Sequence, residues 1–160
     1  MNDTLMPDKL YKFALNRIEA WRTINLQIGF TNGCFDLLHP GHISLLSKAK
    51  SECDKLIVGL NSDVSVGRLK GSQRPVQTEE ARATILNSLK AVDCVIIFNE
   101  DTPLKLIERI KPDVLIKGGD YKLSQVVGAD FIKVNGGRVV LASYQMGHST
   151  SKLINKIENL

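Results

Sequence analysis

Cysteine is scarce in this sequence and is not arranged for disulfide or metal chemistry. The three residues, Cys34, Cys53 and Cys94, are odd in number and form no C-x-x-C pair. A disulfide framework or a zinc cluster needs paired or closely spaced cysteines, so neither is expected to organise the fold. A reducing cytoplasm is the simplest setting for such a chain.

Long apolar runs are also missing. Nowhere do about 18 consecutive apolar residues occur, as a membrane-spanning helix would require. The N-terminus carries Asp3, Asp8 and Lys9 and lacks the apolar centre of a signal peptide. The sequence therefore predicts a protein that neither spans a membrane nor is exported.

Charges of one sign do not gather into runs, and aromatic residues are few. Lysine and arginine total 21 against 17 acidic residues, and aromatic residues make up 6% of the chain. A nucleic-acid binder would show a basic patch or basic residues interleaved with aromatic ones, so nucleic acid is not an expected partner. The dispersed basic excess suits a small anionic ligand better.

What the chain does have is a globular composition over 160 residues, with 43% hydrophobic residues and no internal repeat. One domain of this size buries roughly 70% of the surface that its unfolded chain exposes. Five short apolar runs stand out because they are continuous, which is typical of strands buried on both faces. They are residues 27–32, 55–60, 94–98, 113–117 and 138–143.

Helical patterns lie between these runs, which predicts an α/β fold: a Rossmann-like, doubly wound, five-stranded parallel sheet. In 78–92 we expect Thr78 as N-cap and an inward face of apolar residues, namely Ala81, Ile85, Leu89 and Val92. In 102–112 we expect Thr102 as N-cap, Pro103 at the first helical position and three inward residues, Leu106, Ile107 and Ile110. Residues 42–53 and 149–160 also have helical patterns.

An added N-terminal helix is expected before the first strand. Residues 7–22 place Leu10, Phe13, Ala14, Arg17 and Trp21 at near-helical spacing. We divide the chain into a helical extension, 1–26, and a main domain, 27–160. The extension would either cover the sheet or contact a second copy in a homodimer.

Two of the three histidines, His39 and His42, follow the first strand in the segment H-P-G-H. Gly41 lets backbone N–H groups approach a ligand, so both imidazoles could face a phosphate at a helix N-terminus and donate hydrogen bonds to it. Taken alone, the pair could instead end a turn and cap a helix. A metal pair is a weaker alternative, because helical ligands sit better at i, i+4 and no third ligand is near.

The letters around the pair favour phosphate chemistry. The segment N-G-C-F-D-L-L-H-P-G-H resembles the first signature of the cytidylyltransferase-like nucleotidyltransferases, a G-x-F-D-x-x-H-x-G-H element after the first strand. The six matching positions are Gly33, Phe35, Asp36, His39, Gly41 and His42. The resemblance implies that Thr31, Asn32, Gly33, Phe35 and Gly41 line the nucleotide and that Asp36 contacts the second substrate.

The second signature of that family is a hydroxyl-rich helix start near the C-terminus. Here G-H-S-T-S-K-L-I supplies Gly147, Ser149, Thr150 and Ser151, although His148 stands where the family more often has Ile or Cys. These hydroxyls and the free N–H groups of the helix would hold the β- and γ-phosphates. Alone, the segment would be read as an ordinary N-cap.

Basic and glycine-rich stretches between the signatures supply the remaining candidates. The resemblance favours Lys70 for the transferred phosphoryl group, Arg82 near the phosphates and Arg74 for the second substrate, although surface bases are usually just solvated. The segment I-K-G-G-D-Y follows the fourth strand, where an α/β sheet places a nucleotide. From it we expect Lys117, Gly118 and Asp120 to bind the nucleotide.

Two further sequence segments narrow the resemblance within this family. The segments K-P-D-V-L-I-K-G-G-D-Y and N-G-G-R-V-V-L look like those of the heptose 1-phosphate adenylyltransferases. This implies transfer of AMP from ATP to D-glycero-β-D-manno-heptose 1-phosphate, giving ADP-heptose for bacterial surface polysaccharide and pyrophosphate. Mg²⁺ would be held mainly by the triphosphate, with no protein ligand assigned, and a separate heptose kinase would supply the sugar phosphate.

Two rival functions remain open. A cytidylyltransferase for glycerol 3-phosphate or a related alcohol phosphate would share both signatures and the fold. A regulatory module could keep the fold and bind a nucleotide without catalysis, although the intact His39 and His42 pair weighs against it.

Overall fold

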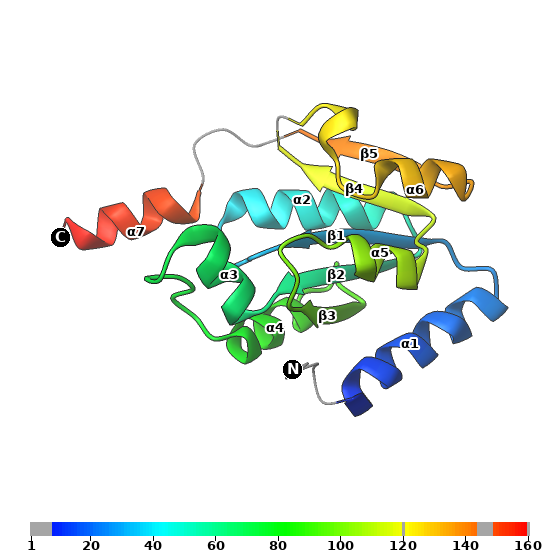
Figure 1. Cartoon of the computed structure of the whole chain (residues 1–160), viewed down its shortest axis with the longest axis horizontal. Helices are drawn as coiled ribbons and strands as arrows, with labels where there is room; N and C mark the ends of the chain where they lie inside the picture. Colours follow the sequence, from blue (N-terminus) through cyan, green and yellow to red (C-terminus); the bar gives the residue numbers. More distant parts are fainter. Residues whose placement is uncertain (1–7, 120, 144–148, 160) are drawn as a thin grey trace.

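A computed structural model describes residues 8–119, 121–143 and 149–159, and its centre is a five-stranded sheet (Figure 1). All strands are parallel, in the order β3–β2–β1–β4–β5. They are β1 (Ile28–Gly33), β2 (Lys55–Asn61), β3 (Cys94–Phe98), β4 (Val114–Gly118) and β5 (Arg138–Ala142). The five predicted strands and the doubly wound fold class are confirmed.

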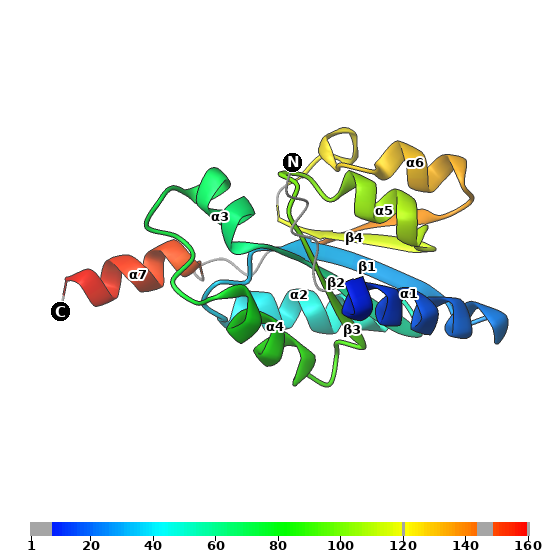
Figure 2. The same cartoon turned by 60° about the horizontal axis from the view of Figure 1, so that its bottom comes forward.

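Helices cover both faces of the sheet (Figure 2). The structure assigns α1 (Asp8–Thr23), α2 (Pro40–Ser51), α3 (Asp63–Lys70), α4 (Glu79–Asn87), α5 (Leu104–Ile110), α6 (Ala129–Val134), α7 (Thr150–Glu158) and a short 3₁₀ turn, η1 (Leu123–Gln125). The first face carries α1, α5 and α6, and the second carries α2 and α4. In Figure 1, α3 and α7 lie beyond the carboxyl ends of the strands.

The continuous apolar runs are explained by this double cover. In β2, Ile57 packs into the core beneath α1 and α5, whereas its neighbours Leu56 and Val58 pack into the core beneath α2 and α4. Successive strand residues point to opposite faces, so a strand covered on both sides must be apolar throughout. The chain runs to one side of β1 for β2 and β3 and to the other for β4 and β5, which makes the carboxyl end of β1 the switch point where such sheets bind ligands.

The N-terminal helix covers the sheet of its own chain. Ala14, Ile18 and Trp21 are buried in the same core as β1 and β3. Phe13, which shares the near-helical spacing of Ala14 and Trp21, is 61% exposed. Ile18, which the spacing pattern did not include, is the most buried residue of this face, at 1% exposure.

Two other helices also differ from the sequence prediction. Thr78 caps α4 as expected, accepting from the Ala81 backbone N–H at 3.4 Å. The predicted inward face is confirmed only in part: Val92 is buried and Leu89 packs against the same core, whereas Ile85 is 36% exposed. The helix ends at Asn87, and Arg82 is one of its buried residues.

The N-terminus of α5 also corrects the sequence prediction. The predicted Thr102 cap is wrong: α5 begins at Leu104 with Pro103 as N-cap, and no side chain caps it. Leu106, Ile107 and Ile110 are buried as predicted. Within the described residues, no helix has the length and apolar character needed to cross a bilayer.

Candidate active site

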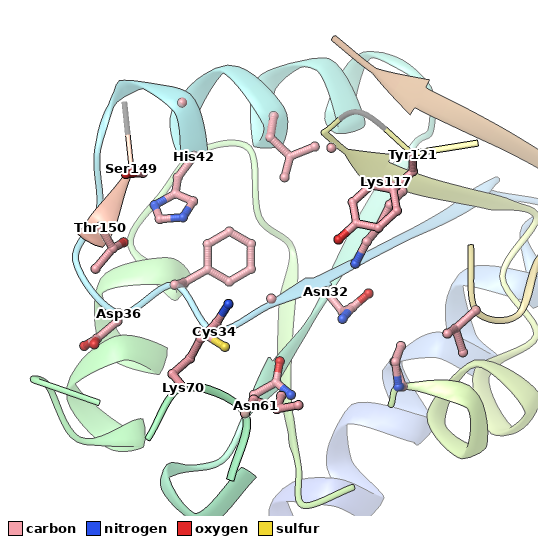
Figure 3. A pocket seen from close by; sticks show the side chains of 18 of the residues that line it. Asn32, Cys34, Asp36, His42, Asn61, Lys70, Lys117, Tyr121, Ser149 and Thr150 are labelled. Carbon is pink, nitrogen blue, oxygen red and sulfur yellow. The ribbon is translucent and has the colours of Figure 1, made fainter. Parts of the chain in front are cut away.

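A cleft of about 590 Å³ opens at the carboxyl ends of the strands (Figure 3). It lies at the switch point, where an open α/β sheet binds its ligand. Its volume falls within the range usual for small-molecule sites. Most of the residues predicted from the sequence line this cleft, namely Asn32, Gly33, Phe35, Asp36, His39, Gly41, His42, Lys70, Arg74, Lys117, Gly118, Ser149, Thr150 and Ser151.

The two histidines stack on each other at one wall of the cleft. The ring centroids of His39 and His42 are 3.8 Å apart with an interplanar angle of 22°. The Phe35 ring lies 5.1 Å from that of His42 in a tilted arrangement. The pKa of His42 is lowered to about 4, mainly by burial and also by the nearby His39, while a hydrogen bond to the Leu37 carbonyl acts in the opposite direction. His42 is therefore neutral at pH 7 and has a single ring N–H, which donates to the Leu37 carbonyl.

The local chain explains this placement. His39 is the N-cap of α2 in an extended conformation, and Pro40 occupies the first turn, where its missing N–H costs nothing. The His42 backbone N–H donates to the His39 carbonyl at 2.9 Å, which fixes the two residues one turn apart. The Ile43 backbone N–H also donates to the His39 carbonyl, so in the described part of the chain the Gly41 N–H is the first-turn donor left for an anion.

A second helix start faces the same cleft. Ser149 caps α7, accepting from the Lys152 backbone N–H at 3.2 Å. The Thr150 hydroxyl donates to the Leu37 carbonyl at 3.2 Å, which joins α7 to the turn before His39. Two helix N-termini and their hydroxyl and imidazole groups therefore converge on one cleft, an arrangement suited to phosphate. Gly147 and Asp120 lie outside the described residues.

Cationic side chains reach the cleft from opposite walls. Lys70 is the last residue of α3 and is exposed, whereas Lys117 is the penultimate residue of β4 and its ammonium lies 5.2 Å from the Tyr121 ring centroid. Burial lowers the pKa of Lys117, and Lys70 across the cleft lowers it further, with Cys34 acting in the opposite direction. An anionic ligand would relieve both the desolvation and the repulsion.

Asp36 serves the neighbouring loop, although the sequence assigned it to the second substrate. Its carboxylate accepts from Arg74 Nε at 2.6 Å and from the backbone N–H groups of Val76 and Gln77. Burial alone would raise the pKa of Asp36, but these hydrogen bonds outweigh it and the pKa is lowered. The side chain is fully buried, so its structural partners occupy the carboxylate, and it places Arg74 at the cleft.

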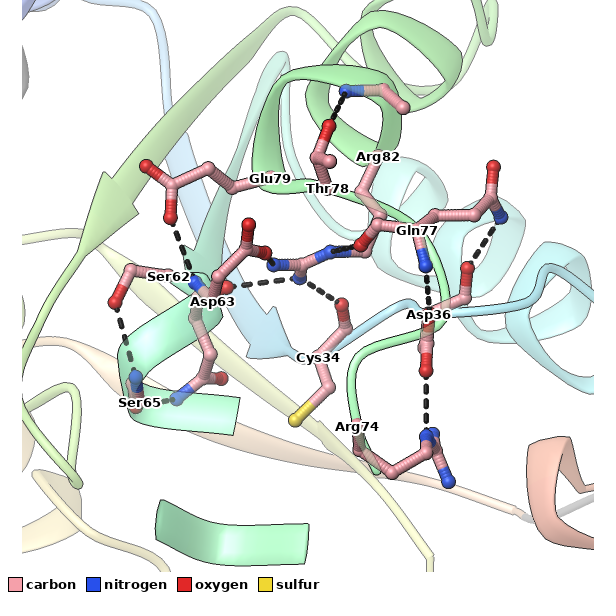
Figure 4. A network of polar contacts seen from close by, with 12 residues as sticks. Cys34, Asp36, Ser62, Asp63, Ser65, Arg74, Gln77, Thr78, Glu79 and Arg82 are labelled. Atoms are coloured by element: carbon pink, nitrogen blue, oxygen red, sulfur yellow. Dashed lines mark hydrogen bonds and ion pairs between the residues drawn. The ribbon is translucent and has the colours of Figure 1, made fainter. Parts of the chain in front are cut away.

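Two predicted nucleotide-binding side chains do not line the cleft. Thr31 is fully buried within β1, and its hydroxyl finds no hydrogen-bond partner among the described residues. Arg82 is only 1% exposed, and its guanidinium bonds main-chain carbonyls and Asp63 (Figure 4). The expected contact of Arg82 with phosphates is thus replaced by contacts inside the protein.

Comparison with known proteins identifies the family. The sequence profile described as cytidylyltransferase-like matches residues 30–156. The chain belongs to the cytidylyltransferase-like family. It is therefore a nucleotidyltransferase, and the first signature, the fold and the converging helix starts agree with that assignment.

Among the relatives of this nucleotidyltransferase are two named bifunctional protein HldE. The one from Caulobacter vibrioides is 58% identical over 89% of this chain and 29% of its own length. The one from Nitrobacter hamburgensis is 59% identical over 88% of this chain and 29% of its own length. The chain thus spans less than a third of the length of these relatives.

Solved structures confirm the fold. A lipopolysaccharide core biosynthesis protein from Thermoplasma volcanium aligns with a TM-score of 0.61 and 28% identity, covering 78% of this chain and all of that one. A pantoate-β-alanine ligase from Francisella tularensis aligns with a TM-score of 0.59 at 20% identity, over 91% of this chain and 76% of its own, and shows the shared fold alone.

Several residues of the nucleotidyltransferase cleft were not predicted. Asn61 ends β2, Asp101 and Thr102 follow β3, and Tyr121 and Gln125 follow β4. Their position just past a strand was a usable signal, because the carboxyl ends of parallel strands meet at one edge. Cys34 also lines the cleft, and burial raises the pKa of its thiol. Among the described residues, no group of three or more His, Cys, Asp or Glu side chains could hold a metal ion.

Proposed function

We propose that this nucleotidyltransferase transfers AMP from ATP to D-glycero-β-D-manno-heptose 1-phosphate, releasing pyrophosphate. The observation that carries the transfer chemistry is the convergence of the His39 and His42 stack and the Ser149–Ser151 helix start on one cleft. The heptose acceptor is supported by the sequence resemblance to heptose 1-phosphate adenylyltransferases. Relatives named HldE and a neighbour named for lipopolysaccharide core biosynthesis agree with it.

In this reaction an oxygen of the acceptor phosphate attacks the α-phosphorus in line. A new P–O bond forms there, while the bond from the α-phosphorus to the oxygen that bridges to the β-phosphorus breaks. Pyrophosphate leaves with that electron pair. Mg²⁺ enters with ATP and neutralises part of the triphosphate charge.

The protein's part is to place these groups and to stabilise developing charge. The phosphoryl oxygens would compete with the Leu37 carbonyl for the single N–H of neutral His42, and His39 stacks on the His42 ring. Ser149, Thr150 and Ser151 take the β- and γ-phosphates. Lys70 binds the transferred phosphoryl group through its ammonium.

The far side of the cleft holds groups that suit a polyhydroxylated acceptor. Lys117 offers a positive charge to a phosphate, and Asn32 lies close by on the end of β1 (Figure 3). Asn61 and Asp101 line the adjoining wall. Amide and carboxylate groups are the usual partners of sugar hydroxyls, which donate and accept hydrogen bonds.

The test is product identification by mass spectrometry after incubation with Mg²⁺, ATP or CTP, and a panel of acceptors. The panel contains heptose 1-phosphate, a hexose 1-phosphate and glycerol 3-phosphate. We expect ADP-heptose and pyrophosphate from ATP and heptose 1-phosphate. The His42→Ala protein, purified in parallel, controls for contaminating transferases.

Other outcomes would overturn the proposal. CDP-glycerol from CTP would assign the chain to the alcohol-phosphate cytidylyltransferases. Nucleotide binding without any product from a folded protein would favour a regulatory module.

A further inference from the structure

Phe35 adopts a backbone conformation that a bulky residue rarely takes. Its φ is +44°, in the left-handed region, and its side chain is only 3% exposed. Such a conformation persists only where the surroundings hold it. The Phe35 ring contacts that of His42, so the stability of this turn bears directly on the histidine stack.

Both carbonyls that flank Phe35 are held from one segment (Figure 4). Arg82 Nη1 donates to the Cys34 carbonyl at 2.5 Å, and Gln77 Nε2 donates to the Asp36 carbonyl at 2.6 Å. The two donors are also joined to each other, because Arg82 Nε donates to the Gln77 carbonyl at 3.0 Å. The peptide groups on either side of the turn are therefore fixed by a single connected unit.

Arg82 extends this unit to the next strand. Its Nη1 also donates to the Asn61 carbonyl at the end of β2, at 2.9 Å, and its Nη2 pairs with Asp63 at 2.7 Å. Glu79 in turn accepts from the Asp63 backbone N–H at 2.7 Å. A guanidinium has five N–H donors, and four of those of Arg82 are used by these contacts and the Gln77 carbonyl. At 1% exposure the side chain has no free face for a ligand.

We propose that Arg82 and Gln77 are positioning residues: together they hold the Phe35 turn by its two flanking carbonyls and so fix the His39 and His42 stack at the cleft. Arg82 also sets the carboxyl end of β2 relative to that of β1. The expected effect on turnover rests on the proposed transferase function. The effect on the His42 ring does not.

The test compares two variants. Arg82→Lys keeps the positive charge but loses the several N–H donors of the planar guanidinium. Gln77→Glu keeps the shape of the side chain but replaces its N–H donor by a carboxylate acceptor. In both we expect kcat to fall about 10- to 100-fold, since small displacements of catalytic groups have effects of this size. KM for ATP should change by less than about threefold, because neither side chain lines the cleft. Arg82→Met should be worse than Arg82→Lys, which retains part of the donor set.

Arg22→Lys is the matched control. Arg22 also donates to main-chain carbonyls, those of Ile110 at 2.5 Å and Lys111 at 2.6 Å, but at the C-terminal end of α5. The same substitution there should leave kcat unchanged. Circular dichroism and thermal melts establish that each variant is folded under the assay conditions.

A second readout needs no substrate. The imidazole of His42, assigned by the loss of its NMR signal in His42→Asn, is titrated in each folded variant. The titratable neighbour that acts on it is His39. In Arg82→Lys and Gln77→Glu the pKa of His42 should move from about 4 toward its ordinary value of 6.5, because a loosened turn admits water to the ring.

The outcomes separate the two proposals. A raised KM for ATP with intact kcat would make Arg82 a phosphate ligand and overturn the positioning role. An unchanged His42 titration in folded variants would also overturn it. If the wild-type protein transfers no nucleotide to any acceptor, the proposed function fails, and the titration alone decides the positioning role.

Discussion

His39 and His42 stack with their ring centroids 3.8 Å apart, and the Phe35 ring lies 5.1 Å from that of His42. Burial and the adjacent imidazole both disfavour a charge on His42, which explains why its pKa falls to about 4. At neutral pH His42 is therefore uncharged in the free protein, and its single N–H donates to the Leu37 carbonyl. Its contribution to catalysis would come from an aimed N–H group, and a positive charge would not be needed in the free enzyme.

His42→Ala should lower kcat on the order of 100- to 1000-fold, as loss of a donor to the transition state does. Binding of ATP should weaken by only a few-fold, roughly, because the helix starts still hold the phosphates. Pyrophosphate release and calorimetry measure the two quantities. Ile43→Ala, in the next residue of α2 and 42% exposed, is the control and should behave as wild type. Wild-type turnover in His42→Ala would remove the histidine from the mechanism.

Stability should decline in mild acid. The pKa of His42 is lower in the folded protein, about 4, than the ordinary 6.5, so the unfolded chain binds a proton that the folded chain rejects. The free energy of unfolding should then fall as pH drops from 6.5 to 4, by up to about 3 kcal/mol. Urea unfolding across this range measures it.

His42→Asn should remove this loss between pH 6.5 and 4. The lowered pKa of Asp36 acts in the same direction, since its carboxylate loses stabilising bonds on protonation, but only below its ordinary value of 3.8. Parallel stability curves for wild type and His42→Asn across the upper range would contradict the assignment.

Lys117→Met should raise the free energy of unfolding of the ligand-free protein and weaken its affinity for ATP or the acceptor phosphate. Among the described residues no carboxylate pairs with the Lys117 ammonium, whose neighbour is the Tyr121 ring. Removing this partly desolvated charge should add about 1 kcal/mol to the free energy of unfolding. ATP or acceptor phosphate should bind roughly 10- to 100-fold more weakly, because a charge-assisted hydrogen bond is lost.

Lys105→Met, at a lysine that is 79% exposed, is the control for Lys117→Met. It should change neither the melting temperature nor the affinity. A destabilised Lys117→Met protein with normal affinity would show that the ammonium serves the fold.

The buried face of α1 can be tested with a pair of substitutions, one at buried Ile18 and one at exposed Phe13. Ile18→Ala should lower the free energy of unfolding by about 2–5 kcal/mol, because it opens a cavity beneath α1. Phe13→Ala should change it by less than about 0.5 kcal/mol, since that ring is largely in water. Trp21 is the single tryptophan and lies in the same core, so its fluorescence follows the unfolding. Equal costs at the two positions would place both residues against the sheet.

The strands could be predicted because a strand buried on both faces needs a continuous run of apolar residues. A strand such as β2, covered by helices on both sides, must be apolar at successive positions. Helices α3 and α6 have a weaker periodic pattern of apolar residues, since eight and six residues complete too few turns for an apolar face to repeat.

The cleft was predicted where resemblance supplied the residues and was incomplete elsewhere. Arg82 shows the physical limit most clearly. A charged residue in an amphipathic pattern is normally assigned to solvent, yet here three carbonyls and a carboxylate from distant segments satisfy it in the interior. Those acceptors come together only in the folded chain, so no local pattern indicates them.

The last helix brings the Thr150 and Ser151 hydroxyls to the cleft but has few contacts that hold it in place. No side chain of α7 is buried, and Leu153 and Ile157 are 38% and 62% exposed. An element with so little apolar anchorage opens at low energetic cost. Occupancy of the cleft and protection of the C-terminal segment are then thermodynamically linked, so a bound triphosphate would slow amide exchange and proteolysis at this end of the chain.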